Sequence, residues 1–152
     1  MPLRPVRFSV AQFLLLISLA AILTSAGILL VPPAGQPEFW ASAVAFSPDG
    51  KLIFVTDMRG SRMRVLEAMT LKLAGTFGEG ELSAPHDAVF DQAGRLLVAD
   101  TGHDRIAMYE GNGAQAKLIG ELKGLSGPEG VAVAADGRVL VSNTRGATLS
   151  VF

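Results

Sequence analysis

Residues 83–111, SAPHDAVFDQAGRLLVADTGHDRIAMYEG, contain short apolar runs separated by turns, the first of which ends in Gly94. Apolar and β-branched residues with glycine-containing turns between them are typical of antiparallel strands. We therefore predict four short strands in this part of the chain, at residues 88–91, 95–99, 105–109 and 117–122. The quoted stretch also holds both histidines of the chain, His86 and His103.

Two other stretches repeat this pattern with a period of about 43 residues. AVAFSPDGKLIFVTDMRGSRMRVLE begins at Ala43, and GVAVAADGRVLVSNTRGATLSVF begins at Gly130. Each copy has a glycine in its first turn and an aspartate or asparagine where its second strand ends. Four antiparallel strands per period of this length are typical of a β-propeller blade. The sequence therefore predicts an all-β fold built from blades at residues 42–84, 85–127 and, incompletely, 128–152.

The repeats also resemble a known family. GRLLVADTGHDRIAMYE, preceded by APHDAVFD, resembles an NHL repeat, and GPEGVAVAADGRVLVSNT resembles the same pattern, whereas FSPDGKLIFVTD is closer to a YVTN-type propeller repeat. The resemblance covers residues 42–152 and implies a six-bladed, TolB-like propeller, of which about 2.6 repeats are present. A partial ring would leave unpaired strand edges. We therefore expect a fragment of a longer protein; the alternatives are self-association that completes the ring and a truncated gene without a function.

The N-terminal region is predicted to carry a targeting signal. Residues 13–31, FLLLISLAAILTSAGILLV, have no charge and as a helix would be long enough to cross a bilayer. Two arginines precede the run, so the positive-inside rule predicts a cytoplasmic n-region at 1–12 and export of the rest. The run is either an uncleaved signal anchor or a signal peptide cut after Ala26. The domain is then membrane-anchored and periplasmic or extracellular, or it is secreted. Residues 32–41 follow as a proline-rich linker.

Composition narrows the function classes. The chain has no cysteine, which excludes disulfides and a lipoprotein anchor. After residue 31 it has three more acidic than basic residues, and together with export this argues against a nucleic-acid partner. No phosphate-binding glycine motif opens a helix.

Acidic residues at the end of the second strand recur with a basic partner. Asp57 and Asp100 are each followed five positions later by an arginine, Arg62 and Arg105. In the third unit both charges are absent together, and Asn143 stands at the acidic position. Joint loss is what a local pair would show, so we interpret these pairs as structural: the aspartate caps a turn and the arginine neutralises it.

The histidines occupy loops that open on one face of the disc. His86 leads into the first strand of its unit and lies nearer the propeller axis, while His103 lies between the second and third strands. The position of His86 is Glu129 in the third unit and approximately Ser42 in the first. Imidazole and carboxylate groups around the channel could contribute metal ligands, zinc or calcium among them, so His86 and Glu129 are candidate ligands. His103 and Asn143 are candidates for a binding face.

The resemblance extends to two classes of metal-dependent propeller. PHDAVFDQAGRLLVAD resembles segments of the peptidylglycine α-amidating lyase type, in which histidines hold zinc. Glu129 and Asn143 resemble residues that hold a divalent metal in the gluconolactonase type. The sequence departs from the first type because only His86 stands at an axial position.

Two functions follow as hypotheses, and the sequence leaves open whether the chain is an enzyme. The first is a non-catalytic module at the cell envelope that binds a protein, peptide or glycan with its rigid loop-bearing face. The alternative is a metal-dependent propeller enzyme, resembling the amidating lyase or gluconolactonase types, in which an axial divalent cation acts as a Lewis acid.

Overall fold

The computed structural model of the chain describes residues 20–24, 27–31, 40–111 and 113–152. The chain forms two compact units, Met1–Glu38 and Phe39–Phe152. The predicted n-region at 1–12 and most of the predicted linker at 32–41 lie outside the described residues.

In the first unit, the structure differs from the predicted hydrophobic helix. Strands β1 (Ala20–Thr24) and β2 (Gly27–Val31) pair in antiparallel fashion within the run predicted to be helical, and the rest of that run lies outside the described residues. An uncharged apolar run cannot be assigned to helix or strand by periodicity, and β-branched residues at positions 22, 24, 28 and 31 favour a strand. Among the described residues, no helix is long and apolar enough to cross a bilayer.

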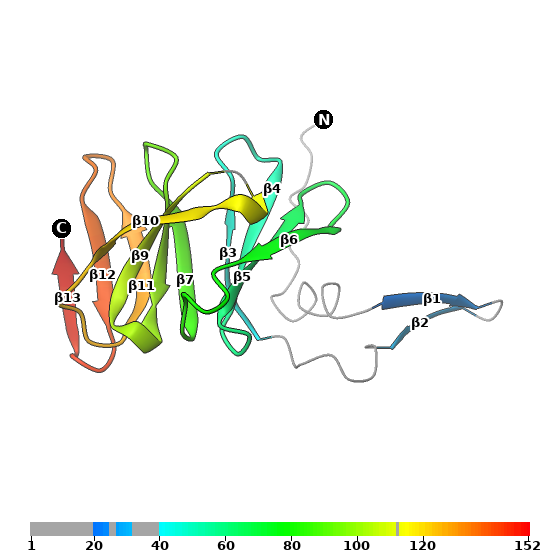
Figure 1. The fold of residues 1–152 in the computed structure, drawn as a ribbon, viewed down its shortest axis with the longest axis horizontal. Coiled ribbons are helices and arrows are strands. Elements are labelled where there is room, and N and C mark those ends of the chain that lie inside the picture. Colours follow the sequence, from blue (N-terminus) through cyan, green and yellow to red (C-terminus); the bar gives the residue numbers. More distant parts are fainter. Residues whose placement is uncertain (1–19, 25–26, 32–39, 112) are drawn as a thin grey trace, which may run out of the picture. The chain divides into compact units, whose positions relative to one another are not determined.

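The second unit consists of three antiparallel sheets, which are the expected blades and lie side by side (Figure 1). Blade 1 contains β3 (Ala41–Phe46), β4 (Leu52–Asp57), β5 (Arg62–Glu67) and β6 (Leu73–Phe77). Blade 2 contains β7 (Pro85–Phe90), β8 (Leu96–Asp100), β9 (Arg105–Glu110) and β10 (Lys117–Leu122), with short 3-10 turns η1 (Thr101–His103) and η2 (Gly113–Gln115). Blade 3 contains β11 (Pro128–Val133), β12 (Val139–Asn143) and β13 (Thr148–Val151).

The four strands predicted in the middle repeat are β7 to β10. The largest difference between the predicted and observed strand bounds is at the start of β7, which begins at Pro85 rather than Ala88. A β-bulge between these two residues allows Pro85 to pair with Asp100 of β8. The turn after the first strand of each blade needs a residue with positive φ, and glycine supplies it: Gly50, Gly94 and Gly137 have φ of 69°, 79° and 88°.

The blades pack through their faces, with the first strands at the inner position. Strands β3, β7 and β11 are neighbours, although each belongs to a different sheet. Because side chains alternate along a strand, β8 uses one face against each neighbour: Val98 packs in the cluster shared with blade 1, and Leu97 in the cluster shared with blade 3. All five residues of β8 are buried. Blade 2 is therefore a complete internal blade.

Aromatic rings join blades 1 and 2. Phe54 of β4 meets Phe90 of β7 with ring centroids 5.1 Å apart, and Phe77 of β6 meets Tyr109 of β9 at 5.0 Å, both edge to face. Phe54 also meets Phe77 at 6.2 Å. Such contacts stabilise a core by about 0.5–1.5 kcal/mol beyond the burial of area. They fix the width of the space between the two blades.

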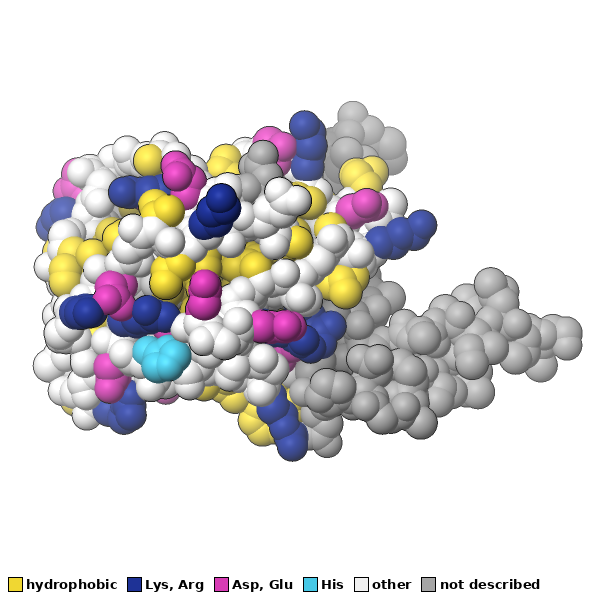
Figure 2. Space-filling view, in the orientation of Figure 1, with side chains coloured by type: hydrophobic (Ala, Val, Ile, Leu, Met, Phe, Trp, Pro, Cys, Tyr) yellow, Lys and Arg dark blue, Asp and Glu magenta, His cyan; other side chains and the backbone are white. Residues whose placement is uncertain are grey.

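The face shown in Figure 2 carries Lys and Arg side chains interspersed with Asp and Glu, with apolar side chains between them. On this face, the part of the chain that the structure describes presents no continuous basic surface.

Candidate functional site at the loop face

One end of the blades carries the loops that lead into each first strand and the loops between second and third strands, and we call this end the loop face. Strands β4, β8 and β12 all finish here in a buried polar residue: Asp57, Asp100 and Asn143 are 1%, 0% and 3% exposed. A buried charge or amide is stable only when its hydrogen-bonding groups are satisfied. The partners of these three residues therefore determine how the loop face is built.

In blade 1, the Asp57 carboxylate accepts hydrogen bonds from a backbone amide and from two arginines. The Gly60 amide donates to Oδ1 at 2.9 Å, and the Nε atoms of Arg62 and Arg64 each donate to Oδ2 at 3.1 Å. The register places Arg62 directly opposite Asp57. A Cβ atom on Gly60 would lie 2.4 Å from the Asp57 Oδ2 atom, so the carboxylate leaves room only for glycine there.

In blade 2, the Asp100 carboxylate holds two different loops together. The Ser83 amide, in the loop that leads into β7, donates to Oδ1 at 2.7 Å. Arg105 Nε donates to Oδ2 at 2.7 Å, and His103 Nδ1 lies 2.9 Å from the same oxygen. Arg105 continues to Glu121 at 3.0 Å. The carboxylate thus fixes the loop between β8 and β9 against the preceding loop.

His103 differs from its counterparts in the other two blades. The third residue after the buried polar residue is Gly60 in blade 1 and Gly146 in blade 3, whereas blade 2 has histidine. Because a carboxylate accepts and does not donate, the contact with Asp100 puts the ring proton on Nδ1 and leaves Nε2 as the second polar atom. The side chain is 48% exposed. The His103 imidazole is therefore accessible to solvent, and its contact with the buried Asp100 carboxylate fixes its orientation.

In blade 3, the network works without charge. The Ser126 amide donates to Asn143 Oδ1 at 3.3 Å, and Asn143 Nδ2 donates to Thr148 Oγ1 at 3.2 Å and to Ser150 Oγ at 2.9 Å. We predicted Asn143 as a binding-face residue. The structure places it in the blade interior, where its amide group is used to close the loop.

Neighbouring blades are tied together at the loop face. Ser61 Oγ accepts from the Ala84 amide at 3.3 Å, and at the equivalent place Asp104 Oδ1 accepts from the Gly127 amide at 2.6 Å. Arg145 donates to the same Asp104 oxygen at 2.6 Å. The repeat comparison alone did not reveal these contacts, although the polar residues at the positions of Ser61 and Asp104 were their signal.

The axial candidates, His86 and Glu129, are the second residues of β7 and β11 and are both partly buried. The two strands are neighbours, and the Asp87 carboxylate beside His86 accepts from the Val131 amide of β11 at 2.9 Å. The His86 carbonyl accepts from Thr56 Oγ1 at 3.2 Å. Within the described residues, no three His, Asp or Glu side chains are grouped closely enough to hold a metal ion. Asp87 was missed by the sequence analysis because its partner is a backbone amide in another blade.

The buried Tyr109 hydroxyl is a titratable group beside the loop face. The ring is 1% exposed, and its hydroxyl donates to Glu81 Oε2 at 3.2 Å. Burial raises the pKa of the Tyr109 hydroxyl well above its usual value, and the negative charge of Glu81 raises it further. The tyrosine therefore remains a neutral donor and cannot serve as a base near neutral pH.

Comparison with known proteins supports the fold. A family model described as strictosidine synthase-like, N-terminal, matches residues 114–147. No curated protein matches the sequence. Among solved structures, hydrazine synthase from Kuenenia stuttgartiensis is 20% identical with a TM-score of 0.63, covering 78% of this chain and 35% of that one.

Two further solved structures are similar. A catalytically inactive virginiamycin B lyase from Staphylococcus aureus, with quinupristin, is 17% identical with a TM-score of 0.62, covering 85% of this chain and 46% of that one. A luciferin-regenerating enzyme is 18% identical with a TM-score of 0.56, covering 82% and 42%. The chain thus spans less than half the length of these three structures. At these identities the likeness shows the fold alone, and the second unit has a β-propeller fold.

The buried networks make a stability prediction. Asp57→Ala removes the buried acceptor of the Gly60 amide and of the Arg62 and Arg64 Nε atoms, while Arg62 keeps its ion pair with Glu79, so we expect a loss of about 1–3 kcal/mol in the free energy of unfolding. The triple variant Asp57→Asn, Arg62→Thr, Arg64→Ser copies the uncharged set of blade 3 and should be clearly more stable than Asp57→Ala. Urea unfolding measures both; equal losses for the two variants would contradict the assigned partners.

A second prediction concerns alkaline pH. Because burial disfavours ionisation of Tyr109 in the folded state, its contribution to stability is present below pH about 10, the pKa of an exposed tyrosine, and is lost as the pH rises beyond it. Tyr109 is the single tyrosine of the chain. Absorbance of tyrosinate at about 295 nm should stay absent from the folded protein at about pH 11 and rise near pH 10 in urea. Tyr109→Phe should remove this part of the alkaline instability. Ionisation near pH 10 with native circular dichroism would contradict the burial.

Proposed function

We propose that this chain is a ligand-binding propeller module and that its loop face recognises a protein, peptide or glycan partner. The observation that carries the proposal is the His103 imidazole held by Asp100 at 2.9 Å, at a position where the other two blades have glycine. A side chain that is accessible yet already oriented loses little conformational freedom on binding. The loops around it are tied down by Asp100, Asp104 and Arg145, which adds to this preorganisation.

The proposed location is outside the cytoplasm, at the cell envelope or secreted. The support is the uncharged run at 13–31 with two arginines before it and no basic residue after it until Lys51. Membrane and medium fractions, probed with an antibody against residues 83–111, test this; recovery in the cytoplasmic fraction alone would contradict it.

The mass of the recovered band also tests our proposal that the chain is part of a longer propeller rather than one completed by self-association.

A second candidate function is a metal-dependent propeller enzyme. The specific observation in its favour is the placement of His86 and Glu129 at equivalent positions of adjacent inner strands, β7 and β11. Imidazole and carboxylate ligands suit zinc, and carboxylate suits calcium. Bound zinc or calcium would polarise an oxygen of the substrate, and His86 and Glu129 would hold the ion. Stoichiometric metal in the purified protein that falls on His86→Ala would favour this candidate over the binding module.

The loop-face proposal is tested by binding to peptide and glycan arrays. His103→Gly gives blade 2 the residue of its two neighbours and removes the imidazole, and we expect affinity for a selected ligand to fall at least about tenfold. The matched control is Arg138→Ala at the opposite end of blade 3, whose side chain pairs locally with Asp136; it should bind unchanged. A ligand that His103→Gly retains and Arg138→Ala loses would contradict the proposal.

A further inference from the structure

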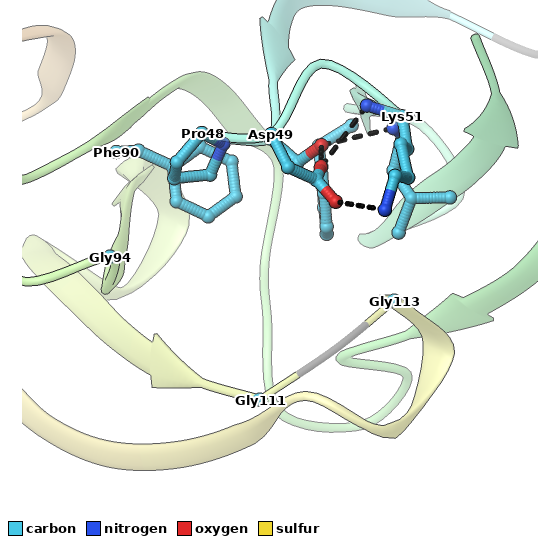
Figure 3. Close-up of a pocket in the computed structure, with 10 residues that line it drawn as sticks. Pro48, Asp49, Lys51, Phe90, Gly94, Gly111 and Gly113 are labelled. Carbon is cyan, nitrogen blue, oxygen red and sulfur yellow. Dashed lines mark hydrogen bonds and ion pairs between the residues drawn. The ribbon is translucent and has the colours of Figure 1, made fainter.

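A cavity of about 570 Å³ opens between blades 1 and 2 at the end opposite the loop face. Figure 3 shows Pro48, Phe90 and the Asp49–Lys51 pair along one side, with the backbone of Gly111 and Gly113 along the other. The volume is within the range of small-molecule sites, about 300–1,000 Å³. Because the loop face lies at the other end of the strands, this cavity is separate from the site proposed above.

A difference between the repeats explains why the cavity is open here. The turns after β3, β7 and β11 share the same hydrogen bond from glycine, and the second residue of the turn is Pro48, Gln92 and Ala135 respectively. Gln92 Nε2 donates to the Ala135 carbonyl at 2.7 Å and so ties the turns of blades 2 and 3 together. Pro48 has no side-chain donor, so blade 1 has no equivalent tie to blade 2 at this position.

The lining combines aromatic and glycine surfaces. Phe54 and Phe90 stand edge to face at 5.1 Å, and Leu52 adds aliphatic surface. Gly94 also lines the cavity, and a Cβ placed on it would meet nothing within 4 Å. The cavity surface at Gly94 is therefore accessible backbone without a side chain. Aromatic rings pack well against such surfaces, edge to face or offset.

One charged pair lies at the rim. Lys51 Nζ is 3.4 Å from Asp49 Oδ2, and their side chains are 81% and 56% exposed. Asp49 Oδ1 also accepts from the Ser47 hydroxyl at 2.7 Å and from the Lys51 amide at 3.1 Å. The carboxylate is therefore held in place, whereas the ammonium group has further donors for a ligand oxygen.

We propose that this cavity binds a planar aromatic ring system of one or two fused rings, packed against Phe90 and Leu52 and against the small accessible part of Phe54. A polar substituent of the ligand faces Lys51 at the rim. The ring is supplied by a free aromatic compound or by an aromatic side chain of a peptide, because the chemistry of the contact is the same in both.

Titration of the ¹⁵N-labelled protein with indole tests the proposal by amide chemical shifts. We expect saturable shifts at Leu52, Phe90 and Gly94. Pro48→Gln introduces the donor that blade 2 has in Gln92, and because it should tie the two turns across the cavity, we expect at least a tenfold weaker affinity. Gln92→Ala is the matched control between blades 2 and 3 and should leave indole binding unchanged.

A second titration with a blocked tryptophan tripeptide identifies the source of the ring: tighter binding than indole with shifts at Lys51 assigns a peptide, and weaker binding assigns a free compound. Phe90→Ala provides a second variant in case Pro48→Gln disturbs the turn, and it should also weaken binding. The proposal is overturned by non-saturating shifts, by shifts confined to exposed apolar residues such as Phe46 or Leu149, or by equal affinity of Pro48→Gln, Phe90→Ala and the parent protein.

Discussion

A buried carboxylate or amide at the end of the second strand closes the loop of each of the three blades. Asp57 and Asp100 are charged groups with almost no exposure to water, and taking such a group out of water costs several kcal/mol unless its partners compensate. The partners are backbone amides and arginines, and for Asp100 one of the amides belongs to Ser83, in the preceding loop. These contacts act together with the buried side chains of Leu82 and Leu125 and with the hydrogen bond from the Gly102 amide to the Ser83 carbonyl at 2.8 Å. The buried carboxylate orients the loop that these contacts anchor.

Comparison of the blades separates architecture from specialisation. Positions that keep their role in different blades, such as Ser61 and Asp104, stabilise the packing of one blade on the next. Positions that differ without an evident structural need stand out against this background. His103 stands where blades 1 and 3 have glycine at the loop face, and at the opposite end Gln92 supplies a side-chain donor where blades 1 and 3 have Pro48 and Ala135. The two proposed binding sites rest on these two differences.

Much of the fold could be predicted from sequence because the repeat and the turn glycines are local signals. The strands of the middle repeat and the positive φ of Gly94 follow from residues close together in the chain. The pairing of Asp57 with Arg62 could also be predicted, because the two residues flank one hairpin turn. The tie from Asp100 to Ser83 and the bridge from Asp87 to Val131 were not, because each has a backbone amide as its partner across a loop or between blades.

The N-terminal strands and the cavity are two further features that could not be predicted from the sequence. An uncharged apolar run has no polar face, so hydrophobic periodicity could not distinguish helix from strand at residues 20–31, and the β-branched residues were the one signal for a strand. The cavity depends on how far two blades stand apart, which is set by the contact of Phe54 with Phe90 at 5.1 Å and by the absence of a glutamine at position 48. Pro48 can be read from the sequence, but the space that it leaves between the two turns exists only once the blades are packed.

Native-state hydrogen exchange at the Ser83 amide tests the central claim most directly. Ser83 lies in a loop, yet its amide donates to the buried Asp100 carboxylate, whereas the Lys51 amide donates to the exposed Asp49. After correction for intrinsic rates, the account predicts that Ser83 exchanges about 100-fold or more slowly than Lys51, in the range of the β8 amides. Equal exchange of Ser83 and Lys51 would show that the buried carboxylate does not hold the loop, and would contradict the account.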